Sequence, residues 1–390
     1  VKHQKYFPIF EGGLTAQFLV VSDGATQIET VRLGNERVLL ARLEDASFFW
    51  KEDCEVPLTH CVEQLRQVVF QKGLGSVWDK QQRLVKLSEI LVQHLKYPSH
   101  KKDILRAAEL VKADLVTQMV IEFPALQGQM GALYALEQGE SEAVSTAIKE
   151  HYYPRFSGDN LPQTPAGIVL SLADKLDTIT SCFYNGLIPS GSQDPWGVRR
   201  AMLGILQLIL HHKLTLSLED LLQISYKLFG DGDYSAELNP FYVQRIRGYF
   251  LDQYSDVEGI HAIVDSQLSL ALPDPYRLSC FIKDYVSFSE NQTVAKHLQD
   301  TAVRVFRLSQ KGSDDTVDPT LFELDIEKSS WSLFQTLTSE FKQHVGSYSF
   351  MPILDNYARL NQPMDQYFED VMVLTKDPVL QKNRLAFLIQ

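Results

Sequence analysis

Hydrophobic side chains recur at helical spacing along most of this chain. Leu84, Leu87, Leu91 and Leu95 follow one another at three- and four-residue steps, which places them on one face of an α-helix. The stretch 35–51 has the same character, with its apolar residues along one broad side. We therefore predict that the chain is mainly α-helical from residue 35 onward.

The first 33 residues have a different pattern, typical of β-strands. A short apolar run at 18–21 ends at the turn signal Ser22-Asp23-Gly24, and residues 30–33 resume an extended character. We predict a small β-containing segment at the start of the chain.

Several helix boundaries are marked by turn and capping residues. Asp194 followed by Pro195 predicts an N-cap and a first-turn proline for a helix over 198–212, which is apolar nearly all round and is expected to be buried between layers. Ser217 and Asp220 have the spacing of a capping box, and Gly230 is the predicted end of that helix. The stretches 230–239 and 312–319 are polar or glycine-rich and predict a linker and a second break.

Composition narrows the class of protein. The length of 390 residues predicts several domains, and the first residue, Val1, suggests a piece of a longer protein. The net charge of −12 argues against a protein that coats nucleic acid without specificity, but it allows local basic faces. Four scattered cysteines indicate neither a metal knuckle nor a disulfide framework, and no apolar run is long enough to span a membrane. A cytoplasmic protein fits best.

Two aspartates one helical turn apart, Asp174 and Asp177, are the first candidates for chemistry. Their segment IVLSLADKLDT, after AAELVKADL and EHYYP, resembles the HD superfamily of helical metal-dependent phosphohydrolases. Those proteins hold divalent ions with a first His, a His-Asp pair, often a later His and a final Asp. The resemblance assigns the Asp of the pair to Asp114, the later His to His151 and the final Asp to Asp174, with His94 or His100 as the first His.

The position before Asp114 is Ala113, so the nitrogen ligand of the His-Asp pair is missing. Two alternatives remain open. In the first, Asp114, His151 and Asp174 hold a hard cation weakly through oxygen ligands, as in a metal-dependent phosphohydrolase. In the second, the two aspartates pair with Lys112 or Lys175 inside an inert helical scaffold. The missing histidine favours the scaffold.

A second resemblance covers essentially the whole chain. It rests on five segments in order: HQKYFPIF (3–10), GNERVLLARLEDASFFWKED (34–53), KGLGSVWDKQQR (72–83), KADLVTQMVIEFPALQGQMG (112–131) and GLIPSGSQDPWGVRR (186–200). Together they are similar to the beta subunit of the bacterial tetrameric glycyl-tRNA synthetase, without its N-terminal part. The tail PMDQYFEDVMVLTKDPVLQKNRLAFL (363–388) resembles the end of the helical anticodon-binding domain shared with arginyl-type synthetases.

This resemblance implies a division of labour. The alpha subunit carries the class II catalytic site and uses ATP and Mg, while the beta subunit binds tRNA(Gly) and is needed for charging. It implies no catalytic residue, metal or cofactor in this chain, no membrane or DNA partner, and a heterotetramer of two alpha and two beta subunits. The implied domains are the end of an N-terminal α+β body (1–60), an HD-like helical domain (61–200), a helical linker region (201–285) and an anticodon-binding helical bundle (286–390).

Binding of tRNA requires cations for phosphates and flat groups for unpaired bases. Arg199 and Arg200 follow a predicted helix start, where backbone amides also favour an anion. Arg304, Arg307 and Lys311 share one helical face. The further candidates are Lys149, Arg155 and the run 100–102 for the acceptor stem, at most one of Arg245 and Arg247, Lys382 and Arg384 in the closing helix, and Tyr348, Phe350 and Tyr357 for stacking. The alternative to RNA contact for each candidate is a position on the solvated surface, a structural ion pair, as for Arg384, or a place in the core.

Overall fold

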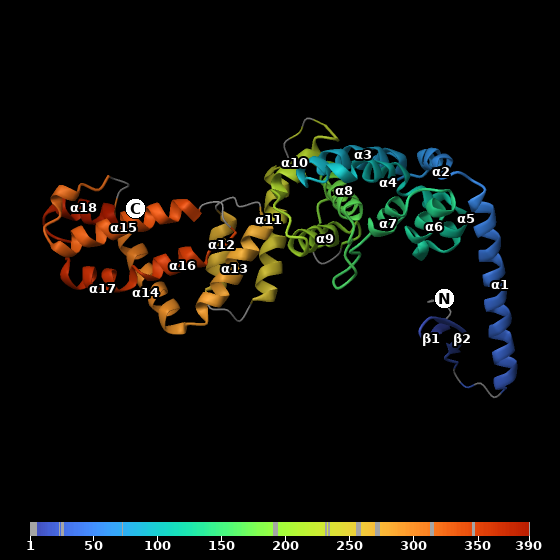
Figure 1. The fold of residues 1–390 in the computed structure, drawn as a ribbon, viewed down its shortest axis with the longest axis horizontal. Helices are drawn as coiled ribbons and strands as arrows, with labels where there is room; N and C mark the ends of the chain where they lie inside the picture. The colour runs from blue at the N-terminus through green and yellow to red at the C-terminus, as the bar shows by residue number, and fades with distance from the viewer. Residues whose placement is uncertain are drawn as a thin grey trace.

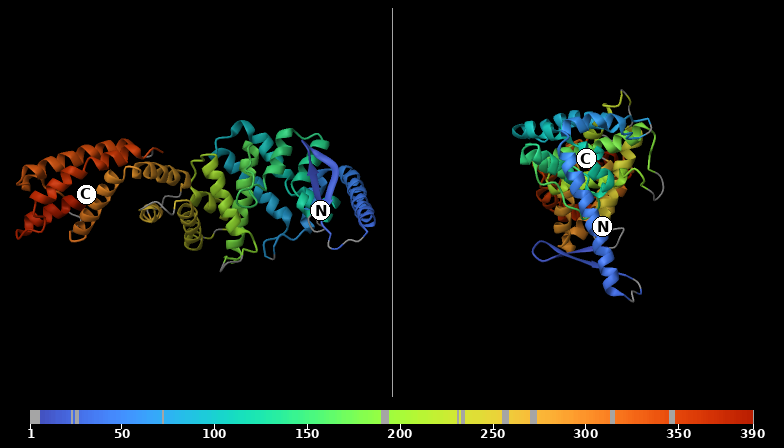
Figure 2. Two further views of the ribbon diagram at one scale, coloured as in Figure 1. Left: turned by 90° about the horizontal axis from the view of Figure 1, so that it is seen from below. Right: turned by 90° about the vertical axis from the view of Figure 1, so that its right-hand side faces the viewer.

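The protein is an elongated, mostly helical molecule with a small β-hairpin near its N-terminus, as the computed structural model shows (Figure 1). The structure describes residues 6–389 apart from 23, 25–26, 72, 190–193, 231, 233–234, 255–258, 270–273, 313–315 and 345–347. The left view of Figure 2 shows the same elongation, with the hairpin and the C-terminal helices at opposite ends, and the right view looks at the molecule from the end that carries the hairpin. No described helix is long and apolar enough to cross a membrane.

The N-terminal part consists of an antiparallel hairpin and one long helix. Strand β1 (Tyr6–Phe10) pairs with β2 (Leu14–Val20), which confirms the predicted β segment. Helix α1 spans Ile28–Cys54, so the predicted helix over 35–51 is confirmed and the predicted extended character of residues 30–33 is wrong. Arg32 pairs with Glu29 at 2.9 Å and with Glu36 at 2.6 Å, and such pairs one turn apart favour a helix.

A compact helical body follows α1. It comprises α2 (Leu58–Gln64), α3 (Val77–His94), α4 (Lys101–Leu110), α5 (Gln118–Glu122), α6 (Gln129–Glu137), α7 (Glu142–Glu150), α8 (Pro165–Tyr184), α9 (Val198–His211) and α10 (Leu218–Tyr226). Leu84, Leu87 and Leu91 of α3 lie in its core, as their spacing predicts. Helix α8 is central, because sixteen of its twenty residues are buried. Any charged side chain on α8 therefore needs a partner from a neighbouring helix.

The start of α8 is fixed by a buried carboxylate. Glu150 accepts hydrogen bonds from the backbone amides of Gln163 and Thr164 at 3.0 and 3.1 Å. The backbone of Gly167 approaches this carboxylate so closely that a Cβ there would lie 2.1 Å from Glu150 Oε2 and 2.8 Å from its Cβ. Only glycine fits this contact between α7 and α8.

The boundaries of α9 and α10 differ from the predicted ones in detail. Helix α9 confirms the predicted helix, but its N-cap is Gly197, with φ +73°, and not Asp194. The Asp194 carboxylate nevertheless accepts from the amides of Arg199 and Arg200 at 3.3 and 3.2 Å, so it satisfies donors of the first turn.

Ser217 caps α10 as predicted, accepting from the Asp220 amide at 3.1 Å. The predicted stop at Gly230 is wrong, because α10 ends at Tyr226. The predicted linker 230–239 is shorter than expected, since the next helix begins at Ser235; residues 231, 233 and 234 lie outside the described residues.

The remaining helices extend the molecule away from the body. They are α11 (Ser235–Gln253), α12 (Ile260–Ser269), α13 (Pro275–Ser289), α14 (Gln292–Ser309), α15 (Asp325–His344), α16 (Met351–Ala358), α17 (Asn361–Asp370) and α18 (Pro378–Ile389). Helices α14 to α18 form the end of the molecule (Figure 1), with an apolar cluster of their own around Tyr367 and Phe387. The break predicted at 312–319 agrees with the end of α14 at Ser309 and the start of the next turn at Pro319; its residues 313–315 lie outside the described residues.

Candidate functional site

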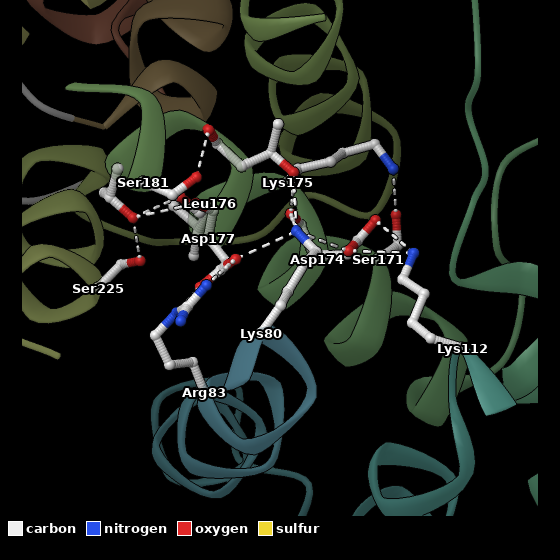
Figure 3. A network of polar contacts seen from close by, with 12 residues as sticks. Lys80, Arg83, Lys112, Ser171, Asp174, Lys175, Leu176, Asp177, Ser181 and Ser225 are labelled. Carbon is white, nitrogen blue, oxygen red and sulfur yellow. Dashed lines mark hydrogen bonds and ion pairs between the residues drawn. The ribbon is translucent and has the colours of Figure 1, made fainter. Parts of the chain in front are cut away.

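A buried network of ion pairs surrounds the two aspartates of α8. Lys80 of α3 lies 3.1 Å from Asp174 and 3.1 Å from Asp177. The Arg83 guanidinium, one turn further along α3, lies 2.6 Å from Asp177. Lys112 reaches Asp174 from the turn after α4, at 3.2 Å. Figure 3 shows these side chains converging on α8 from two directions.

The ammonium groups around Asp174 keep its carboxylate ionised. Burial alone would raise the pKa of Asp174, but the ammonium groups of Lys112 and Lys80 hold it well below its usual value. Burial would likewise lower the pKa of Lys80, and the facing carboxylates of Asp174 and Asp177 raise it instead. Two carboxylates thus face three cations, so the positive charge that a bound metal ion would supply to an HD-type site is supplied by side chains.

The other two positions assigned by the HD resemblance each have one polar atom in a local contact, while Asp114 Oδ1 and His151 Nε2 are buried without a described hydrogen-bond partner. Asp114 Oδ2 accepts from the amides of Gly128 and Gly131 at 2.5 and 3.1 Å, which caps the start of α6. The Nδ1 of His151 lies 2.5 Å from the Ile148 carbonyl, and burial lowers the pKa of this histidine well below its usual value, so the ring is neutral. Among the described residues, no group of three or more His, Cys, Asp or Glu side chains is arranged to hold a metal ion.

Of the two lysines predicted as possible partners of the aspartates, only one pairs with an aspartate in the structure. Lys112 pairs with Asp174, as the scaffold alternative predicts, but Lys175 donates to the Tyr153 carbonyl and to Ser171 Oγ, both at 2.8 Å. Sequence reasoning missed Lys80 and Arg83. A signal existed, because Lys80 precedes Leu84 and Leu87 by four and seven residues and therefore lies on the buried face of α3.

Lys175 makes stability depend on pH. Burial lowers its pKa from 10.5 to about 7. Between these values the unfolded chain holds a proton that the folded chain has lost, so the free energy of unfolding rises with pH across that window. We expect Lys175→Met to remove up to about 1 kcal/mol per pH unit of this rise, measured by urea unfolding at about pH 7 and about pH 9. Lys149→Met, at an exposed position, is the control; equal slopes in wild type and Lys175→Met would contradict the assignment.

The basic candidates Lys149, Arg155, Lys101 and Lys102 of the body lie in two kinds of environment. Lys149 and Lys102 are exposed, with no ion pair to a described residue. Arg155 pairs with Asp159 at 2.8 Å, and Lys101 with Glu89 at 2.8 Å. The Lys101–Glu89 pair is exposed on both sides and contributes little to stability, whereas the Asp159 side chain that binds Arg155 is only 5% exposed.

Arg199 and Arg200 lie beside a groove between α9 and α11. Arg200 is exposed and contacts Asp194 at 3.5 Å. The first-turn amides of α9 already bind Asp194, so the expected contribution of this helix start to anion binding is not available. Of the two arginines on α11, Arg247 pairs with Asp265 at 2.6 Å, and Arg245 lines the groove.

The C-terminal basic candidates separate into exposed and structural groups. Arg307 is exposed on α14, and Lys382 is exposed on α18. Lys311 is exposed in the turn that follows α14, so the predicted helical face shared by Arg304 and Arg307 does not extend to Lys311. Arg304 packs its guanidinium 4.2 Å from the ring centroid of Phe368. Arg384 is buried and pairs with Glu327 at 2.7 Å, so of its two predicted roles the structure favours the structural one.

Two of the three stacking candidates belong to the interior. Tyr348 donates to Asp274 at 2.7 Å and stacks on Tyr276. Phe350 is buried with its ring edge-on to Phe281. Tyr357 remains 48% exposed and is the one of the three that is open to an unpaired base.

A family model and several individual proteins match this chain, and their descriptions agree with one another. The family model described as "Glycyl-tRNA synthetase beta subunit" matches residues 1–265. Glycine–tRNA ligase beta subunits from Clostridioides difficile and Bacillus subtilis are each 39% identical over 100% of this chain, which corresponds to 57% and 56% of their own length. The beta subunit from Desulforamulus reducens is 37% identical over 99% of the chain and 57% of its own length. The chain thus spans somewhat more than half of the relatives it matches.

Proposed function

The chain belongs to the glycyl-tRNA synthetase beta-subunit family, and from this premise we propose that it is a tRNA-binding, non-adenylating part of a glycine–tRNA ligase. In this proposal the alpha subunit forms the adenylate with ATP and Mg, and this chain holds tRNA(Gly) for charging. The two subunits work as a heterotetramer with two copies of each, in the cytoplasm.

The structural observation that favours the proposal over a phosphohydrolase is the buried network of ion pairs around Asp174 and Asp177. A phosphohydrolase of the HD type needs its carboxylates free to bind a divalent ion. Here they are bound by Lys80, Arg83 and Lys112, which supports an HD-like domain that serves as a scaffold and holds no metal. The phosphohydrolase alternative is therefore not adopted.

The distribution of exposed cations supports RNA contacts at both ends of the helical region. Lys149 and Lys102 lie on the body, Arg307 lies on α14, and Lys311 lies in the turn that follows α14. We assign the body to the acceptor end of tRNA and the α14–α18 bundle to the anticodon, with Tyr357 as a stacking surface.

The test is selective tRNA binding. With the alpha subunit supplied, the full chain is expected to bind tRNA(Gly) more tightly than an unrelated tRNA, measured by fluorescence anisotropy. Affinity should fall by at least about tenfold between roughly 50 and 200 mM KCl, because phosphate contacts release counterions. The chain alone should form no glycyl adenylate in a pyrophosphate-exchange assay. Equal affinity for the two tRNAs would refute the proposal.

A further inference from the structure

A groove of about 460 Å³, with a largely apolar lining and several charged side chains, lies between α9 and α11. These two helices pack against one another (Figure 1). The walls of the groove carry three arginines and one carboxylate, that of Asp252, on a chain whose net charge is −12. The groove therefore concentrates positive charge on an otherwise acidic molecule. The residues that matter for its chemistry are Arg199, Arg200, Arg245, Gly248 and Tyr249.

Arg245 is the cation within this groove whose charge is least compensated. Its Nε is shielded from solvent and has no hydrogen-bond partner. Its Nη2 donates to the neutral amide of Gln244 at 2.7 Å, and no described carboxylate pairs with it. Arg247, two residues along the same helix, instead pairs with Asp265 at 2.6 Å. A shielded guanidinium donor without an acceptor is costly unless a ligand supplies one.

Arg200 adds a second cation that a ligand could share. Its side chain is 60% exposed; the guanidinium lies 3.5 Å from the Asp194 carboxylate and donates to the Asp194 carbonyl at 3.3 Å. Because Asp194 also caps the first turn of α9, an anion in the groove would be held by the arginine side chains and not by the helix amides.

Gly248 keeps the groove open. A Cβ at this position would meet no atom within 4 Å, so the space beside it is empty and not filled by a neighbour. A glycine inside a helix is unfavourable compared with alanine, and packing at this position gives no reason for it. Tyr249 and Arg245 line the same groove as Gly248.

We propose that this groove binds the sugar-phosphate backbone of an RNA strand, with Arg245 and Arg200 donating to phosphate oxygens and Arg199 adding charge at the rim. Guanidinium groups match the geometry of phosphates and are favoured wherever phosphates are recognised. The inference rests on the proposed function and adds to it the place on the body where tRNA is held.

The test compares three variants of the full chain for tRNA(Gly) binding by anisotropy. Arg245→Gln is expected to weaken binding roughly fivefold to tenfold and to lower the salt slope by about one. Gly248→Phe should weaken binding to a similar degree without changing the charge, because it fills the groove. Arg247→Gln removes the same charge from the same helix outside the groove and should have little effect. Circular dichroism melting of each variant separates misfolding from loss of binding.

The outcomes distinguish the groove from the wider proposal. If wild type shows no selective binding, the proposed function is wrong. If wild type binds selectively but Arg245→Gln and Arg247→Gln behave alike, or Gly248→Phe binds as well as wild type, the groove assignment is wrong. Groove variants that keep tRNA binding and lose association with the alpha subunit would show that the groove binds protein, which would also overturn it.

Discussion

Replacing Asp177 with alanine is expected to destabilise the helical body by about 3–5 kcal/mol, because one partner of a buried ion pair would be left uncompensated. Asp177 is fully buried, and its carboxylate binds both Lys80 and Arg83. Without it, the guanidinium of Arg83 loses its ion pair while still enclosed between α3 and α8. Lys80 would retain only Asp174.

Urea unfolding followed by circular dichroism measures this loss. Glu89→Ala is the matched control, since Glu89 lies on the same helix as Lys80 and makes an exposed pair with Lys101; its cost should stay below about 1 kcal/mol. A loss below about 1 kcal/mol for Asp177→Ala as well would mean that the network is solvated and contributes no specific stability.

The second large effect is expected at the other end of the molecule. Arg384→Met should destabilise the α14–α18 bundle by about 3 kcal/mol or more. Its guanidinium pairs with Glu327, which is fully buried, and also contacts Glu323 at 3.3 Å and the Met372 carbonyl. Removal of the arginine leaves the Glu327 carboxylate without its cation in the bundle.

Tryptophan fluorescence reports this unfolding locally, because Trp331 is the only tryptophan after residue 196 and packs against Phe334 and Phe387. Substitution of the other three tryptophans with phenylalanine isolates its signal. Arg307→Ala serves as the comparison: it removes an exposed arginine from α14 and should change stability by about 0.5 kcal/mol or less, while weakening tRNA binding. A destabilisation as small in Arg384→Met as in Arg307→Ala would contradict a structural role for Arg384.

Local sequence patterns predicted the parts of the fold that depend on local forces. The leucine spacing of α3 and the apolar stretch of α9 predicted both helices, because a helix in a compact protein buries one continuous side. Residues 30–33 were misassigned, since a short alternation of apolar and polar residues does not distinguish a strand from the first turn of a helix. Arg32 forms ion pairs with Glu29 and Glu36 that favour the helix, but these pairs can be recognised only when residues 29–36 are already taken as helical.

The candidate site shows the limit of such patterns more sharply. Asp174 and Asp177 were recognisable as a pair one turn apart, but the partners that decide their chemistry lie far away along the chain. Lys80 is 97 residues from Asp177, and no local spacing links them. Placing a lysine on the apolar face of a helix is unfavourable by itself, and that mismatch at Lys80 was the available clue.

The same distinction separates the basic residues. Arg384 and Arg307 are equally charged in the sequence, yet one is enclosed by glutamates and the other faces solvent. Arg245 and Arg247 differ in the same way, because Asp265 neutralises one and not the other. Charge in the sequence predicts where RNA contacts are possible, and long-range packing decides which are realised.

The buried carboxylates of Asp174 and Asp177 are paired with lysine and arginine side chains, and we predict that they hold no metal ion. Elemental analysis of the chain purified from medium supplemented with Mn, Fe, Ni and Zn tests this most directly. We predict far less than one equivalent of any of these metals, with no change in Asp174→Ala, since both carboxylates are already neutralised by Lys80, Lys112 and Arg83. Stoichiometric metal in wild type, lost together with phosphatase activity in Asp174→Ala, would contradict the account.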